Sequence, residues 1–273
     1  MQYAFPASPR LSLAAQTATR CLMEEDVRAF PIRPLEIIRR RGWQVRTYTQ
    51  TAARYDEHAT AADVADMFGT RDAMASVRLK NGQPVRYLIC YNDQAEIPER
   101  LTFSLAHEIG HILLGHFAFG QPDDLPEAQV RLLDAEANAF AAALLAPAAV
   151  VAQLRSVNSG AGRQIFGLSK SGWQVRLDTL SQEQRTLPQM LTRQLEAQFH
   201  TFMYRRQCKA CGAIFLQKEA CPACGCGQLQ WAPEAGDSFP WTEENWRSAV
   251  LPADDPENPL ADDALWHGDD KGI

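Results

Sequence analysis

The feature that most constrains this chain is the run Ser104–His116, "SLAHEIGHILLGH", which places three of the six histidines in one short apolar segment. Its apolar residues recur at helical spacing, so the run predicts a buried helix. His107 and His111 would then project from one face of that helix, one turn apart. Buried polar side chains need hydrogen-bond partners or a metal ion. The run therefore indicates either a metal site or a hydrogen-bonded core helix, and we favour the metal site.

The residue after the first histidine suggests what such a metal would do. Glu108 lies about 100° further round the helix than His107. Two imidazoles at this spacing can bind one Zn²⁺ while the carboxylate reaches an activated water without being a ligand, which is the zincin arrangement. We predict that His107 and His111 are zinc ligands and that Glu108 is the general base. Gly110, which destabilises a helix interior by about 1 kcal/mol relative to alanine, indicates the close approach of another backbone.

A catalytic zinc takes three protein ligands and keeps one position open. Candidates for the third ligand follow the motif: His116, Asp123, Asp124, Glu127, Asp134 and Glu136. We favour Glu136, because it lies in the middle of a second predicted helix, between Leu133 and Phe140, where an unpaired carboxylate would be costly. Asp124 is expected to cap this helix. His116, beyond the glycine that ends the first helix, is expected to lie outside the ligand shell.

The segment "FSLAHEIGHILLGH", followed by "DAEANAFAAALLAP", resembles the ImmA/IrrE family of metallopeptidases. In that family an HExxH helix precedes a helix of the pattern E-A-N-x-F-A-x-x-L-L-x-P. The resemblance covers roughly residues 14–180 and implies that His107, His111 and Glu136 bind zinc and that Glu108 is the general base. Ala143 and Ala146 stand where family members commonly have an acidic residue and a methionine, which bears on substrate fit.

The resemblance also implies a substrate. It suggests a zinc endopeptidase that cleaves a specific intracellular protein, a helix-turn-helix repressor of a mobile element or stress regulon, so that cleavage derepresses genes. A second hypothesis is a non-catalytic regulatory protein whose zinc sites are structural and which binds a partner. The base beside the first ligand argues against it, because a structural zinc site has no use for one. The sequence does not separate peptide cleavage from hydrolysis of a small amide.

The remaining patterns predict an α+β fold, a zincin-like and mostly helical domain with a small antiparallel sheet. Ser8 and Pro9 are expected to begin the first helix. The Asn81-Gly82 dipeptide indicates a β-hairpin directly before the histidine helix. Its second strand, "RYLICYN", could offer an edge to an extended peptide, or, from its apolar content, be an ordinary core strand. Downstream, "IFGLSKSGWQVRLDTL" resembles a compact helix-turn-helix, and "PQMLTRQLEAQFHTFMYRRQ" predicts one amphipathic helix.

A second metal site is indicated near the C-terminus. Two CxxCG turns contain Cys208, Cys211, Cys221 and Cys224. Two such turns can close a tetrahedral Cys₄ shell with no open position, so we predict a structural zinc in a small module that resembles a zinc ribbon. Cys226 is a spare thiol that could compete with Cys224, while Cys21 and Cys90 lie in apolar settings and are expected to be inert.

These signals divide the chain into four parts. Residues 1–180 would form the metallopeptidase domain, 181–206 a helical connector, 207–230 the Cys₄ ribbon and 231–273 an acidic, largely disordered tail. From Trp231 onward the sequence contains eleven acidic and two basic residues, a net charge of −9. The tryptophans of this tail could dock a partner protein. The sequence lacks the concentrated basic face that would indicate nucleic-acid binding. No secretion signal or membrane span is evident, so we expect a cytoplasmic protein with one catalytic and one structural zinc.

Overall fold

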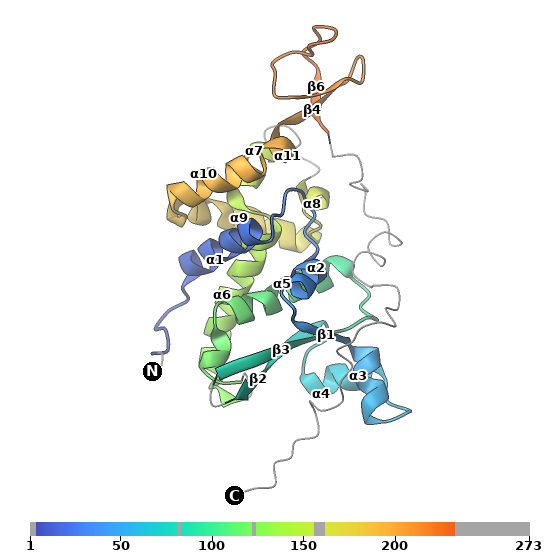
Figure 1. Cartoon of the computed structure of the whole chain (residues 1–273), viewed down its shortest axis with the longest axis vertical. Coiled ribbons are helices and arrows are strands. Elements are labelled where there is room, and N and C mark those ends of the chain that lie inside the picture. The colour runs from blue at the N-terminus through green and yellow to red at the C-terminus, as the bar shows by residue number, and fades with distance from the viewer. Residues whose placement is uncertain (1–3, 81–82, 122–123, 156–161, 233–273) are drawn as a thin grey trace, which may run out of the picture.

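The computed structural model describes residues 4–80, 83–121, 124–155 and 162–232. The fold is α+β and mostly helical, with two small three-stranded sheets (Figure 1). The helices are α1 (Leu11–Glu24), α2 (Pro34–Arg40), α3 (Tyr48–Tyr55), α4 (Ala61–Phe68), α5 (Pro98–Leu113), the 3₁₀ turn η1 (His116–Ala118), α6 (Glu127–Leu145), α7 (Ala148–Arg155), α8 (Gly162–Ile165), α9 (Lys170–Thr186), α10 (Gln189–Gln198) and α11 (His200–Tyr204). The strands are β1 (Gln44–Thr47), β2 (Ala73–Lys80), β3 (Gln83–Tyr91), β4 (Arg205–Cys208), β5 (Ile214–Leu216) and β6 (Leu229–Trp231).

Helices α5 and α6 pack against each other in the middle of the fold (Figure 1). One side of the pair meets strand β2, and α1 packs along α6. Gly110 allows the close approach, because a Cβ there would lie 3.0 Å from Phe140 Cδ1 and 3.2 Å from Ala137 Cα. The approach of another backbone predicted from this glycine is confirmed.

The first sheet has the order β1-β3-β2. Strand β3 pairs in parallel with β1 and antiparallel with β2, so the sheet is mixed and not purely antiparallel. The hairpin is present, with its Asn81-Gly82 turn outside the described residues. Of the two possibilities for "RYLICYN", the core strand is confirmed and the edge strand is wrong, because this segment is mostly β3, the central strand. The edge strand beside α5 is β2.

Several helix ends differ from the sequence expectation. Helix α1 begins at Leu11, with Arg10 at the N-cap position and no side-chain cap, so Ser8 does not cap it. Helix α6 begins at Glu127 after Pro126, not after a cap by Asp124. Helix α3 was not predicted. It begins directly after β1, where Thr47 and Gln50 form a capping box.

A buried ion pair in α9 closes the break between α6 and α7 at Pro147. Arg176 Nε donates to the Ala146 carbonyl at 2.7 Å, and Glu183 Oε1 accepts from the Ala148 amide at 2.9 Å. Arg176 and Glu183 are themselves paired at 2.6 Å and are only 3% and 9% exposed. Together they satisfy a backbone carbonyl and a backbone amide that the break leaves without helical partners.

The C-terminal part carries the second sheet, of order β5-β4-β6, beyond α11 at one end of the molecule (Figure 1). The single helix predicted before it is two, α10 and α11, divided at Phe199. Trp231 Nε1 donates to the Phe202 carbonyl at 2.7 Å and its ring meets that of Phe202, which fixes this sheet to α11. The domain boundary expected at residue 180 falls inside α9. Of the tail, only residues 231 and 232 are described.

Among the described residues no single helix is long and apolar enough to cross a membrane. Helices α6 and α7, which are bent relative to each other, reach the required length and apolar composition only when they are taken together.

Candidate metal centre

Two histidines of α5 and one carboxylate of α6 meet at the packed helix pair. The Nε2 atoms of His107 and His111 are 2.9 Å apart, and Asp134 Oδ1 lies 3.3 Å from His111 Nε2 and 3.8 Å from His107 Nε2. The three ligand atoms lie within 4.8 Å of one another. The side chains of His107 and His111 are 18% and 11% exposed, and that of Asp134 is 42% exposed, so the cluster opens to solvent on the Asp134 side.

This cluster has the chemistry that a divalent metal requires. His107 Nδ1 lies 2.9 Å from the side-chain amide oxygen of Asn138, which can only accept a hydrogen bond. The proton of His107 is therefore on Nδ1, and its lone pair is on Nε2. That lone pair faces His111 Nε2 and a carboxylate oxygen, a group of acceptors that a cation would bring together. Tetrahedral zinc with bonds of about 2.0–2.2 Å places its ligand atoms about 3.3–3.6 Å apart, which lies within the range of the three separations.

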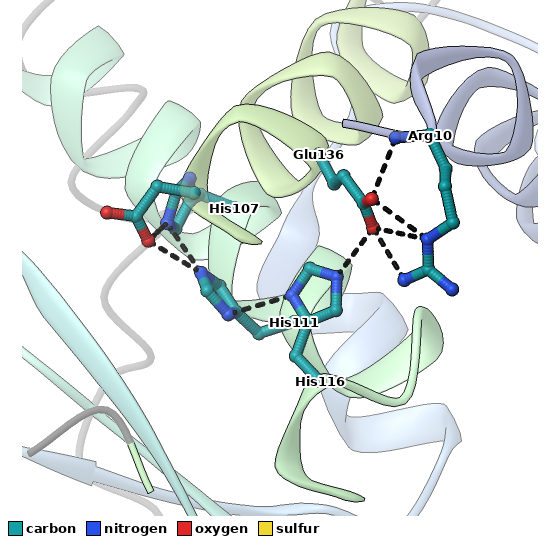
Figure 2. Close-up of polar contacts among 6 residues, drawn as sticks. Arg10, His107, His111, His116 and Glu136 are labelled. Atoms are coloured by element: carbon teal, nitrogen blue, oxygen red, sulfur yellow. Dashed lines mark hydrogen bonds and ion pairs between the residues drawn. The ribbon is translucent and has the colours of Figure 1, made fainter. Parts of the chain in front are cut away.

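Glu136 does not join the two histidines. Its carboxylate is fully buried and accepts from the Arg10 side chain, with Nη2 at 2.7 Å, and from the Arg10 backbone amide at 2.7 Å. The same carboxylate accepts from His116 Nε2 at 3.1 Å (Figure 2). The expectation that Glu136 meets His107 and His111 is therefore corrected, and the carboxylate that meets them is Asp134. The physical reason is helical phase, because two residues along α6 rotate the side chain by about 200°.

His116 lies much closer to the site than expected. Gly115 adopts a left-handed conformation, with φ of +72°, which reverses the chain after α5. His116 returns against His111, with the two Nδ1 atoms 3.1 Å apart and the rings edge to face. The residue is only 2% exposed, and it links His111 to Glu136 (Figure 2).

Glu108 stands beside the cluster, under the edge strand of the sheet. Its Oε2 accepts from the Ala75 backbone amide of β2 at 2.7 Å. Burial raises the pKa of Glu108 to about 7, although His111 and the Ala75 amide act in the opposite direction. A carboxylate with such a pKa is suited to accept and return a proton near neutral pH.

The electrostatics of the other groups agree with a cation site. Burial, with the neighbouring His111 acting in the same sense, lowers the pKa of His107 to about 4. Burial likewise lowers the pKa of His116 to about 4. Burial opposes ionisation of Glu136, but hydrogen bonds from Arg10 and His116 outweigh it and hold its pKa below the ordinary value. A neutral imidazole is the form in which His107 can bind a metal, while the ionised Glu136 serves as the acceptor of Arg10 and His116.

The second cluster is formed by the four predicted cysteines. Cys208, Cys211, Cys221 and Cys224 have their sulfur atoms within 4.8 Å of one another, with separations of 3.6 Å between Cys208 and Cys224 and 3.5 Å between Cys211 and Cys221. Zinc–sulfur bonds of 2.3 Å place tetrahedral sulfurs about 3.8 Å apart. Backbone hydrogen bonds, that from Cys211 first, lower the pKa of Cys208 to about 6, which favours the thiolate.

The cysteine turns have the conformation that the sequence suggested. Gly212 and Gly225, which each follow a CxxC pair, have φ of +74° and +72°. Cys226 is not in the four-sulfur cluster, and its sulfur accepts from the Gln228 amide at 3.4 Å. Cys21 and Cys90 are buried in the core, where burial raises their pKa values to about 12 and 11.

A helix carrying two histidines and a glutamate, completed by a carboxylate from the next helix, is typical of metallopeptidase-type hydrolases. Comparison with known families agrees: residues 59–160 match the family model Peptidase_M78, described as the IrrE N-terminal-like domain. This match supports an ImmA/IrrE-family metallopeptidase domain at residues 59–160, and that family implies a bound metal, usually zinc. No curated protein and no solved structure gives a significant match.

Three residues at this centre were missed or misjudged from sequence. Asp134 is among the sequence candidates for the third ligand, but the sequence favours Glu136. Asn138, the partner of His107, was not considered, although it lies one turn after Asp134 on the same face of α6 and so offered a signal. Arg10 gave no signal, because it is 126 residues from Glu136 in the chain.

Proposed function

We propose that this chain is a zinc-dependent endopeptidase that acts in the cytoplasm on a specific protein, a helix-turn-helix transcriptional repressor. His107, His111 and Asp134 would hold the catalytic zinc, and Glu108 would be the general base. The observation that carries the proposal is the meeting of the three ligand atoms within 4.8 Å, with Glu108 fixed beside them by the Ala75 amide. The Cys₄ cluster would hold a second, structural zinc.

The roles of the residues follow from their contacts. When bound, zinc supplies Lewis-acid polarisation of a peptide carbonyl and makes water acidic at neutral pH. Asn138 orients His107, and Ala75 holds Glu108 Oε2, which assigns proton transfer to the other oxygen, Oε1. Glu108 Oε1 then takes the proton from water and delivers it to the leaving amine nitrogen. Of the tyrosines near the sheet, Tyr91 is 1% exposed and too buried to contact a substrate.

Strand β2 offers the place where a substrate peptide would lie. It is an edge strand of its sheet, and the Ala75 amide points from its free side to Glu108. The Val77 carbonyl accepts from Gln121 at 3.4 Å. Residues 75 and 77 of a strand present their backbone groups on the same side. An extended peptide added along this edge would bring its scissile bond to Glu108, which favours a peptide over a small amide.

The choice of a repressor as target is supported by the family alone. Members of the ImmA/IrrE family, as the resemblance implies, act on helix-turn-helix repressors encoded nearby, and cleavage would derepress transcription. The acidic, tryptophan-bearing tail of residues 231–273 would contribute to partner docking. We propose no role in binding nucleic acid or membranes.

The test is a cleavage assay with the full zinc-loaded chain and a helix-turn-helix repressor encoded beside it. We expect discrete fragments with the native chain and loss of at least 10²-fold in rate for Glu108→Gln. Glu99→Gln, at a partly exposed acidic residue in the first turn of the same helix, is the matched control and should cleave normally. Cleavage by Glu108→Gln at the native rate would remove the base from its role. A stable repressor complex that neither protein cleaves would instead support the non-catalytic regulatory protein.

A further inference from the structure

We propose that Arg10, Glu136 and His116 form a positioning chain that fixes the orientation and tautomer of His111 and so sets the metal affinity of the site. The proposal rests on the proposed function, because it takes His111 as a ligand through Nε2. None of the three residues is placed in contact with the metal or the substrate. They would act through one another, from the N-terminal segment to the site.

The contacts form an unbroken line (Figure 2). Arg10 binds both oxygens of Glu136 through its side chain, with Nε at 2.9 and 3.1 Å and Nη2 at 2.7 Å, and its backbone amide adds a fourth hydrogen bond at 2.7 Å. Glu136 Oε2 meets His116 Nε2 at 3.1 Å, and His116 Nδ1 meets His111 Nδ1 at 3.1 Å. Glu136 and His116 are 0% and 2% exposed, so water does not compete for the contact between them, whereas the Arg10 side chain at the start of the line is 34% exposed.

Proton accounting gives the line a direction. With Arg10 on both of its oxygens, Glu136 is an ionised acceptor, and His116 must present a proton on Nε2. A neutral His116 then has a lone pair on Nδ1, which accepts a proton from His111 Nδ1. His111 is left with its lone pair on Nε2, the atom that faces His107 Nε2 and Asp134. The opposite tautomer of His111 would place a proton where the metal binds.

The N-terminal segment is thereby part of the metal centre. Arg10 lies outside residues 59–160, which match the family model. The segment is anchored at two points, because the Phe5 ring also packs against Phe119, directly after η1, with ring centroids 5.0 Å apart. His107 is held differently, by the exposed Asn138 of the adjacent helix. The two ligand histidines thus have partners of different kinds, and only His111 depends on a buried charge.

A second buried ion pair provides a matched control. Glu183, like Glu136, is buried, is paired with an arginine at 2.6 Å and accepts from a backbone amide, that of Ala148, at 2.9 Å. Its partners are an arginine and a backbone amide, with no histidine in the line. Glu136→Gln and Glu183→Gln therefore make the same chemical change at similar burial. Only the first would alter His111.

The experiment follows the histidine resonances of the full chain by long-range ¹H–¹⁵N correlation while zinc is buffered by a chelator. With only six histidines, the signal of His111 reports its own zinc occupancy and not that of the cysteines. In the native chain we expect a proton on Nδ1 before zinc and zinc on Nε2 afterwards. In Glu136→Gln we expect a mixture of tautomers before zinc and a dissociation constant raised about 10- to 100-fold. Glu183→Gln should match the native chain.

Further variants test that the three residues act in series. His116→Phe should weaken zinc binding as Glu136→Gln does, and the double variant should be no weaker than His116→Phe alone. Arg10→Met should lose affinity, and Arg10→Lys, which keeps the charge but not the planar fork, should regain part of it. These Arg10 variants also serve if Glu136→Gln does not fold.

The outcomes separate this inference from the proposed function. If zinc leaves the His111 signals of the native chain unchanged, the proposed site and the positioning chain both fail. If zinc binds His111 Nε2 in the native chain and equally tightly in Glu136→Gln and Arg10→Met, the positioning chain alone is overturned. Effects of His116→Phe and Glu136→Gln that multiply in the double variant would also overturn it.

Discussion

Replacing Gly110 by alanine should have two opposite effects on the stability of the protein. One arises within α5, and the other arises at the α5–α6 contact that positions the metal centre. Within α5 alone the change should stabilise the protein, because alanine favours a helix over glycine by about 1 kcal/mol. Against α6 it should destabilise the protein. The new Cβ would lie 3.0 Å from Phe140 Cδ1, which belongs to a fully buried ring, and 3.2 Å from Ala137 Cα, which belongs to the backbone.

The backbone contact decides the sign. A ring can turn aside, but Ala137 Cα can move only with α6, so the two helices must separate by a few tenths of an ångström. Overpacking of this kind costs about 1–3 kcal/mol. After the gain in helix propensity, we expect a net loss of about 0–2 kcal/mol, which lowers the Tm by up to roughly 8 °C in a chain of this size. The Asp134–His111 distance of 3.3 Å would widen as well, so zinc affinity should fall.

Thermal unfolding of the zinc-loaded and the zinc-free chain measures both effects. Phe140→Leu supplies the control, because it removes the ring that meets the new Cβ, and Gly110→Ala should lower the Tm less in that background than in the native one. An increase of 2–4 °C in the native background, which helix propensity alone would give, would refute the assignment of Gly110 to the α5–α6 contact.

Three further changes test other parts of the structure. Glu183→Ala should cost about 3–5 kcal/mol in denaturant unfolding, because it leaves Arg176 buried without its charge partner, whereas Ala at the 85% exposed Glu57 should be neutral; equal stabilities would contradict the ion pair that closes the α6–α7 break. Cys211→Ser should remove one zinc per chain and reduce hydrogen-exchange protection of β4, β5 and β6, while Cys226→Ser keeps both metals; two metals in Cys211→Ser would argue against the Cys₄ site. Asn138→Ala should weaken catalytic zinc binding about 10-fold or more with little change in stability, because Asn138 is exposed and orients His107; an unchanged affinity would contradict that role.

The sequence predicted the elements that local patterns determine. Hydrophobic periodicity and the glycine stop located α5, the buried position of Glu136 located most of α6, and the CxxCG turns located the cysteine cluster. Gly110 predicted a close helix contact that the structure contains. Helix α3 was missed, because the capping box of Thr47 and Gln50 that begins it was overlooked.

The third ligand shows where a local pattern reaches its limit. Burial of Glu136 correctly indicated that its carboxylate has partners, but burial does not say which ones. The partners are His116 and Arg10, and Arg10 is distant in sequence and brought near only when α1 packs along α6. The helical phase of α6 is a better guide to the third ligand than burial. Asp134 and Asn138 lie one turn apart on the face that meets α5, whereas Glu136 lies about 200° from Asp134 around the helix.

The central claim is that His107, His111 and Asp134 together hold a metal. Crystals of the zinc-loaded chain, measured on both sides of the zinc absorption edge, would test it directly. We predict two anomalous peaks, one bounded by His107 Nε2, His111 Nε2 and Asp134 Oδ1 and the other by the four cysteine sulfurs. A peak bound by the Glu136 carboxylate, or none at the two histidines, would contradict the account.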